Sequence, residues 1–182
     1  MKTTASLSLL LVLLATAAFA QDQNKEKPAP TPKSVLLFNL ERTHNVKDWF
    51  VPANDAIAGL SAEQAAWTDG KGNHSVGQLT YHLVFWDRRS LAKFKGEPPE
   101  KFSGNNDDTF NNFDPKQWNE LVKQLDQVLT EWENAVQSAD DAKVKQNFEL
   151  VSNLATHNAY HIGEIVMVRK EQGSWNPEKG VK

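Results

Sequence analysis

Apolar residues recur with helical spacing in four long segments of the chain, whereas only a few short runs alternate as β-strands do. The first segment begins at Ser34, a residue type that caps helix N-termini, and continues to Phe50. Pro52 should kink or end this helix, which we expect to continue through Ile57 to Gly59. Its apolar positions are expected in the core: Leu36, Leu37, Leu40, Val46, Trp49 and Phe50.

Three further helices are predicted, and they run from Asn73 or Ser75 to Gly96, from Asp114 to about Val136, and from Phe148 to Gln172. Gly173 is the residue type that most often ends a helix, and Arg169 and Lys170 suit the negative end of the helix dipole. Four long amphipathic helices with short or medium connections pack most simply as a bundle. The predicted fold is therefore all-α, a four-helix bundle.

The N-terminus has the pattern of a secretory signal peptide over residues 1–20. Lys2 precedes an apolar run from Leu7 to Ala18, and Ala18 and Ala20 form a small-residue cleavage motif. No later stretch approaches the roughly 18 unbroken apolar residues of a membrane span. We therefore expect a soluble exported protein, periplasmic or secreted, with no membrane span.

The remaining chain divides into three predicted parts. Residues 21–33 are polar and proline-rich, so they are expected to form a flexible spacer. The bundle is expected over residues 34–176, followed by a tail over residues 177–182.

Composition and charge exclude several classes of protein. The formal net charge is −3 and no basic block is present, so nucleic acid is not an expected partner. The chain contains no cysteine, which excludes disulfides and attachment of a lipid to an N-terminal cysteine. Stability must therefore come from packing or from a metal.

The last predicted helix carries titratable residues on its apolar face. His157, His161 and Glu164 fall within about 60° of arc at 100° per residue, and leucine and valine occupy the same arc. Imidazole nitrogens at positions i and i+4 can reach one divalent ion, and His82 on the second helix is the natural third ligand. A single helical histidine is more often a hydrogen-bonded core or boundary residue, so spacing alone leaves both interpretations open.

Two stretches carry a resemblance to a known family: "SVGQLTYHLVFWDRRSLAKFKGEPP" and "THNAYHIGEIVMVRKEQG". They resemble the DinB/YfiT-like family of small four-helix bundles, and the resemblance extends from about Ser34 to Trp175. In that family one histidine of the second helix and a His-x-x-x-His pair of the last helix bind a divalent metal. The resemblance therefore implies a metal site at His82, His157 and His161.

Glu164 stands where the resembling family usually has glutamine. Its carboxylate could ligate the metal, orient a histidine, act as a base beside bound water, or turn outward into solvent. We take Glu164 as the candidate catalytic residue, and Asn153, one turn before His157, as a weaker candidate for supporting a metal ligand. His44 is expected at the surface because its neighbours in sequence are polar, and His74 is expected at a helix start without a ligand role.

Six tryptophans are present, and four of them occupy core-like helical positions where they most simply fill volume: Trp49, Trp86, Trp118 and Trp132. Trp86 lies one turn beyond His82, so it could instead wall a small apolar pocket beside the metal.

Three neutral histidine ligands leave open coordination positions, as catalytic metals do. Zinc, nickel and iron suit these ligands about equally. The resembling family uses its metal for transfer or isomerisation of small thiols. We therefore predict a metal-dependent transferase or hydrolase that acts on a small molecule, with thiols among the candidates, in the cell envelope.

Two alternatives to this enzyme remain open. The first is a non-catalytic, metal-stabilised protein with a role in stress or interaction, and the second is a helical interaction domain without metal. Similar bundles often dimerise through helix faces, so a homodimer is a candidate assembly.

Overall fold

The computed structural model describes residues 29–111 and 113–180, and these residues form helices and connecting segments without a β-strand. The predicted signal peptide, residues 21–28 of the predicted spacer and the last two residues of the predicted tail lie outside the described residues. Within the described ranges, no helix is both long and apolar enough to cross a membrane.

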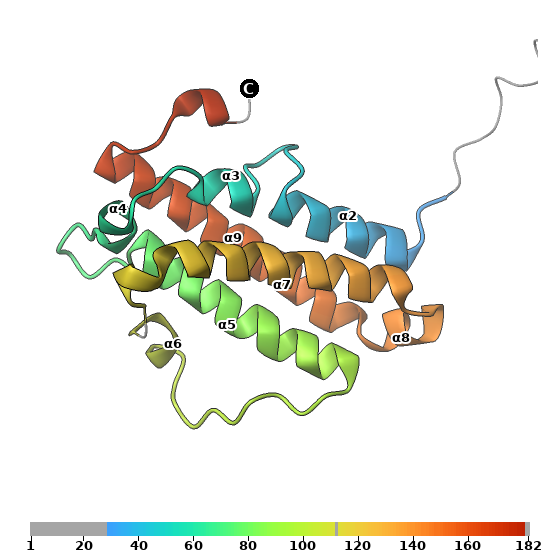
Figure 1. Ribbon diagram of the computed structural model, residues 1–182. Helices are drawn as coiled ribbons and strands as arrows, with labels where there is room; N and C mark the ends of the chain where they lie inside the picture. Colours follow the sequence, from blue (N-terminus) through green and yellow to red (C-terminus); the bar gives the residue numbers. More distant parts are fainter. Residues whose placement is uncertain (1–28, 112, 181–182) are drawn as a thin grey trace, which may run out of the picture. The chain divides into compact units, whose positions relative to one another are not determined.

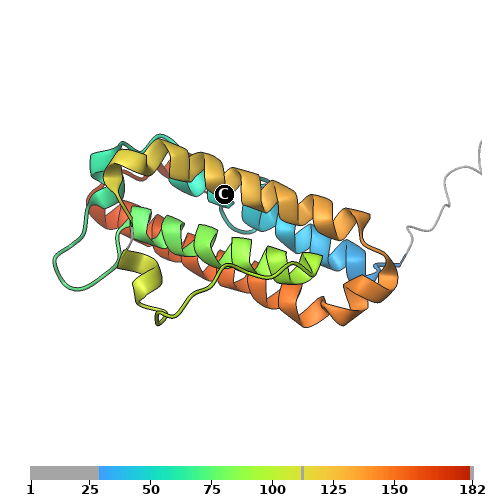
Figure 2. The ribbon, with the colours of Figure 1, turned by 60° about the horizontal axis from the view of Figure 1, so that its bottom comes forward.

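Four long helices build the core of the described chain, namely α2 (Pro32–His44), α5 (Val76–Lys95), α7 (Trp118–Ser138) and α9 (Phe148–Gln172). Helix α7 packs against α2 and α5, and α9 packs against the same two helices. Figures 1 and 2 show the four running side by side. The predicted all-α bundle is therefore confirmed.

Shorter elements connect the long helices. They are α3 (Ala53–Ile57), α4 (Ala62–Ala66), α6 (Asp108–Asn111), the 3-10 helix η1 (Pro115–Gln117), α8 (Asp141–Gln146) and the 3-10 helix η2 (Pro177–Lys179). The sequence patterns did not predict α4, α6 or α8, because helices of four to six residues are too short to show a hydrophobic period. Among these shorter elements, helix α6 packs against α5 (Figure 2).

Local sequence signals set the ends of α5 and α9 as predicted. Ser75 caps α5, since its hydroxyl accepts from the backbone N–H of Gln78 while the Gln78 side chain accepts from the N–H of Ser75. Helix α5 ends at Gly96 and α9 at Gly173, and both glycines have left-handed backbone angles.

The bundle interior is packed with aliphatic and aromatic side chains. Trp132 of α7 is fully buried, and its indole N–H donates to the backbone oxygen of Asp87 on α5 over 3.1 Å. Leu36 and Leu40 of α2 and Leu125 of α7 are also buried almost completely. Each such leucine stabilises the fold by about 1.5–3 kcal/mol relative to an exposed one.

The prediction for the first helix is wrong beyond His44. Helix α2 begins two residues earlier than predicted, at Pro32, with Thr31 as its cap, and it ends at His44 instead of continuing to Phe50. Pro52 has extended backbone angles and precedes the separate helix α3. Proline also disfavours the helical conformation of the residue before it, so Val51 does not continue a helix into α3.

This break changes the positions of three apolar residues expected in the core. Trp49 is 92 % exposed, and Val46 and Phe50 are exposed as well. The prediction of a core position is confirmed for Trp118 and Trp132, which are buried, whereas Trp86 is half-buried.

His44 is buried, with an exposed fraction of 2 %, so the prediction of a surface position is wrong. Its Nδ1 lies 2.7 Å from Oε1 of Glu133, and its Nε2 lies 2.9 Å from Oδ1 of Asp126. Both carboxylates come from α7. We call these three residues the His44 clamp. The polar neighbours of His44 in sequence suggested a surface position. Its two carboxylate partners lie more than 80 residues away, so the local sequence pattern could not reveal them.

Candidate metal centre

Three histidines from two helices meet inside the bundle. Nε2 of His157 lies 3.1 Å from Nε2 of His82 and 3.1 Å from Nε2 of His161. In the described part of the chain, these three form the one group of histidine and acidic residues whose candidate ligand atoms all lie within 4.8 Å of one another. His82 stands on α5, whereas His157 and His161 stand one turn apart on α9.

The spacing of these nitrogens fits a shared cation. Two nitrogens that each lie about 2 Å from one ion, at angles between octahedral and tetrahedral, are about 2.9–3.4 Å apart. Both Nε2 distances from His157 fall in this range. The three residues expected from spacing and resemblance are therefore brought together in a cluster that could hold a metal ion.

The hydrogen bonds of His82 leave its Nε2 free to bind a metal. The Thr109 hydroxyl donates its proton to the backbone oxygen of Asn106 over 2.6 Å. It must therefore accept from Nδ1–H of His82, which lies 2.6 Å away. With the ring proton on Nδ1, the lone pair of the neutral imidazole is on Nε2, which faces the other two histidines.

His161 has the same arrangement with a different partner. Its Nδ1 lies 2.6 Å from Oε2 of Glu164, and a carboxylate at this position accepts a hydrogen bond from Nδ1–H. Nε2 of His161 then presents its lone pair toward His157. The contact matches one of the four roles considered for Glu164, that of orienting a histidine. The Glu164 side chain is 40 % exposed, and its negative charge also raises the pKa of the adjacent Tyr160.

The local environment keeps two of the rings neutral. Burial, reinforced by the nearby His161 and His157, lowers the pKa of His82 to about 3. Burial and the His161 ring also lower the pKa of His157. Metal binding requires deprotonated imidazole nitrogens, so both rings are in the required form at neutral pH.

Aromatic rings form the wall on the α6 side of the centre. Phe110 of α6 stacks on His82, with ring centroids 4.0 Å apart and planes 6° apart. His74 stacks on the opposite face of Phe110 and contributes no atom to the cluster. Trp86 meets His82 edge-on.

The sequence pattern did not indicate Thr109 or Phe110, because they lie in a long polar stretch. The apolar Phe110 within that stretch is the one signal that could have marked an anchored segment.

A second buried polar pair, also missed from sequence, lies on the same two helices. Asp87 of α5 accepts from the side-chain amide of Asn158, the residue after His157, over 3.0 Å. Among the described residues, Oδ2 of Asp87 and Oδ1 of Asn158 have no hydrogen-bond partner. Burial raises the pKa of Asp87 to about 7, against the opposing effect of the Asn158 hydrogen bond. Asp87 and Asn158 interrupt otherwise apolar helix faces, which is the pattern that could have revealed them.

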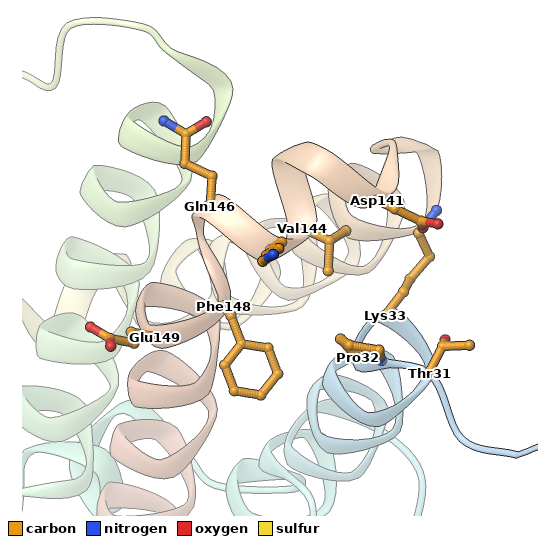
Figure 3. Close-up of a pocket in the computed structure, with 9 residues that line it drawn as sticks. Thr31, Pro32, Lys33, Asp141, Val144, Gln146, Phe148 and Glu149 are labelled. Carbon is orange, nitrogen blue, oxygen red and sulfur yellow. The ribbon is translucent and has the colours of Figure 1, made fainter.

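Two of the cavities differ in their relation to the histidines. One of about 310 Å³ is lined in part by His157, Trp86 and Asn153. Asn153 therefore borders the centre, although within the described residues no hydrogen bond joins its side chain to a histidine. A larger cavity of about 830 Å³ lies where α8 and the start of α9 meet the start of α2, and the Phe148 ring points toward α2 there (Figure 3). No histidine lines that cavity, so the smaller one is the relevant one for chemistry.

Comparison with known proteins supports the same assignment of family. A family model described as the DinB superfamily matches residues 53–165. No match was found among curated proteins or among solved structures. The matched span covers more than half of the chain and contains His82, His157, His161 and Glu164. The chain belongs to the DinB superfamily.

Proposed function

We propose that this protein binds one divalent metal ion through His82, His157 and His161 and acts as a metal-dependent transferase or hydrolase on a small molecule. The observation that carries the proposal is the convergence of three Nε2 atoms, two of them on rings whose Nδ1 protons are directed to Thr109 and Glu164. Three protein ligands leave coordination positions for a substrate or water. Zinc, nickel and iron all suit this ligand set.

A bound ion of this kind supplies a Lewis acid and lowers the pKa of a coordinated water or thiol. The protein supplies the fixed donors and a half-buried approach at His157. Glu164 orients His161 in this proposal, since its carboxylate contacts Nδ1 and the metal-binding nitrogen is on the other side of the ring. A role for Glu164 as a general base stays a prediction.

Elemental analysis tests the metal site directly. Protein isolated without a metal-binding tag should contain one divalent ion per chain, and a chelator should remove it. His161→Ala should abolish binding, whereas His74→Ala should retain the ion because His74 offers no atom to the cluster. Full metal content in the His161→Ala protein would reject the proposal.

A second candidate function is a metal-stabilised protein without turnover. It is favoured by the placement of the ligands on α5 and α9, because an ion held by both helices links two parts of the bundle. The melting temperature should then rise strongly on metal binding. Strong stabilisation without turnover of any thiol or ester in a substrate panel supports this function, whereas turnover that depends on metal supports the enzyme.

We also propose that the protein acts in the cell envelope, on the strength of the signal-like pattern at residues 1–20. Expression with its own N-terminus and mass determination of the product test this location. A mature chain that begins at Gln21 is the expected result, and an uncleaved cytoplasmic product contradicts it.

A further inference from the structure

We propose that the cavity beside His157 is the binding site for the body of the substrate, and that this body is uncharged and partly apolar with an amide or carbonyl group. The inference rests on the proposed metal function. We call the cavity the Trp86 groove. It ends at His157 and is otherwise lined by Trp86, Ser90, Asn106, Leu150, Asn153 and Leu154.

The size and position of the groove suit a small ligand. Its volume of about 310 Å³ is at the lower end of the range for small-molecule sites. His157 belongs both to the groove and to the metal centre, and no other residue does. A molecule in the groove therefore has one end beside the proposed metal and the rest between α5, α9 and the segment before α6.

The walls of the groove favour an apolar body. Trp86, Leu150 and Leu154 supply its apolar surface. The Trp86 ring is held edge-on by Phe85, with centroids 5.2 Å apart, and by Phe102. A wall that is already packed in place loses little conformational entropy when a ligand binds against it.

The polar groups of the groove favour a neutral ligand with hydrogen-bonding atoms. Asn106 and Asn153 carry primary amides, which donate and accept, and Ser90 carries a hydroxyl. Their side chains make no hydrogen bond to another described residue. Among the described residues, no ionised side chain lines the groove, so a charged ligand body would lose hydration without gaining a counter-charge.

A second cavity near the centre has the opposite character. It has a volume of about 230 Å³, and Glu164, Glu171 and His74 are among the residues that line it. Two carboxylates and a smaller volume make it a poor site for an apolar body. The contrast assigns the substrate body to the Trp86 groove.

Binding of hydroxamates to the zinc-loaded protein tests this assignment by calorimetry. The affinity for acetohydroxamate measures binding to the open side of the metal alone, because its methyl group is too small to fill the groove. Benzohydroxamate adds a phenyl ring and should bind about tenfold more tightly, because the groove removes the ring from water. An acetamido group at position 4 of the ring should preserve this gain, whereas a carboxylate at the same position should abolish it.

Variants identify the surface responsible for the gain. Trp86→Ala should remove the advantage of benzohydroxamate without changing the affinity for acetohydroxamate. Asn153→Glu, at an exposed position where the fold is not at risk, should weaken the carboxylate-bearing probe further and reduce the benzohydroxamate gain. Trp49→Ala is the matched control, since Trp49 is 92 % exposed and lies outside the groove, and it should leave all affinities unchanged.

The outcomes separate this inference from the proposed function. Equal affinity for acetohydroxamate and all its larger relatives overturns the groove assignment and leaves the metal site standing. Benzohydroxamate binding that depends on Trp86, without acetohydroxamate binding, supports the groove and contradicts an open metal. Absence of binding by every probe overturns both.

Discussion

The His44 clamp and the three-histidine centre both contain an almost completely buried histidine, and they differ in what faces the two ring nitrogens. Each ring nitrogen of His44 lies within 2.9 Å of a carboxylate oxygen, and the side-chain nitrogen of Asn45 also lies 3.2 Å from Nδ1. Both nitrogens of His44 are taken up by these polar partners, and in the described part of the chain His44 belongs to no group that could share a metal. In His82 one nitrogen faces a hydroxyl oxygen and the other faces two imidazoles.

The comparison shows that burial does not distinguish a structural histidine from a candidate ligand. His44 stands at the last residue of α2, and its two carboxylate partners on α7 link the two helices. His82 is equally buried but has no carboxylate against either nitrogen, so it stays neutral. The partners of each nitrogen therefore decide the role of the ring.

Loss of the His44 clamp should have the largest effect on stability and none on metal content. His44→Ala removes two charge-assisted hydrogen bonds, so the free energy of unfolding should fall by about 3 kcal/mol. This figure takes the lower end of the range for such bonds because water screens the more exposed Asp126.

Denaturant unfolding measures this loss, and elemental analysis should still find one ion per chain. Loss of metal in the folded His44→Ala protein would show that the two regions are coupled.

Removal of the Thr109 hydroxyl should weaken the metal centre without removing a ligand. Thr109→Val leaves Nδ1–H of His82 without its acceptor, and we expect metal affinity to fall about 10–100-fold. Competition with a chromophoric chelator measures the change. Thr109→Ser retains the hydroxyl and should restore most of the affinity; equal affinities for the valine and serine variants would refute the positioning role.

Asp87 tests a third arrangement, a buried acid with neither a cation nor a metal beside it. Its pKa is raised from 3.8 to about 7 in the folded protein, so its contribution to stability is present below pH 3.8 and is lost as pH rises through 7. The free energy of unfolding of Asp87→Asn, relative to that of the wild type, should rise by about 2 kcal/mol between pH 5 and pH 7. The expected slope is about 1.4 kcal/mol per pH unit, and it flattens near pH 7.

The quantity to measure is the difference in free energy of unfolding between the metal-free wild type and the metal-free Asp87→Asn protein at each pH. The lowered pKa of His82 makes both proteins less stable as pH falls from 6.5 toward 3, and this effect cancels in the difference. A difference that does not change with pH would mean that Asp87 titrates near its unfolded value.

The smallest effect is expected at Glu164. Glu164→Gln keeps an oxygen that can accept from Nδ1 of His161, and the side chain is 40 % exposed, so metal affinity should fall less than about tenfold. Chelator competition and turnover should be measured together. Unchanged affinity with loss of turnover would support the general-base role, whereas loss of metal would support direct ligation.

Local signals predicted most of the helical framework. Ser75, Gly96 and Gly173 define helix ends through hydrogen bonds and backbone angles within a few residues, and such interactions can be read from adjacent positions. The prediction for the end of the first helix was wrong because apolar residues at 46, 49 and 50 continue the helical spacing, although the backbone leaves the helix after His44. Periodicity records which residues are apolar, and it does not show that a partner surface exists to bury them.

The candidate site was only partly visible before the structure. His157 and His161 share a face because four residues make about one turn, and this holds for any α-helix. His82 was proposed as the third ligand from its place on the second helix and then supported by resemblance to a family, whereas Thr109, Phe110 and Asp87 were not identified. Nothing near Thr109 in the sequence indicates that its hydroxyl lies 2.6 Å from a ring 27 residues earlier.

By itself, the sequence determined the helical class of the protein, most of the helix ends and the pairing of two histidines on one helix face. These properties follow from backbone hydrogen bonds between residues four apart and from side-chain chemistry at neighbouring positions. Only the tertiary structure decided which nitrogen of each histidine meets a carboxylate, a hydroxyl or another imidazole. Apart from the contacts of His161 with Glu164 and His157 inside α9, those contacts join elements that lie tens of residues apart in the chain, and their geometry depends on how the helices pack.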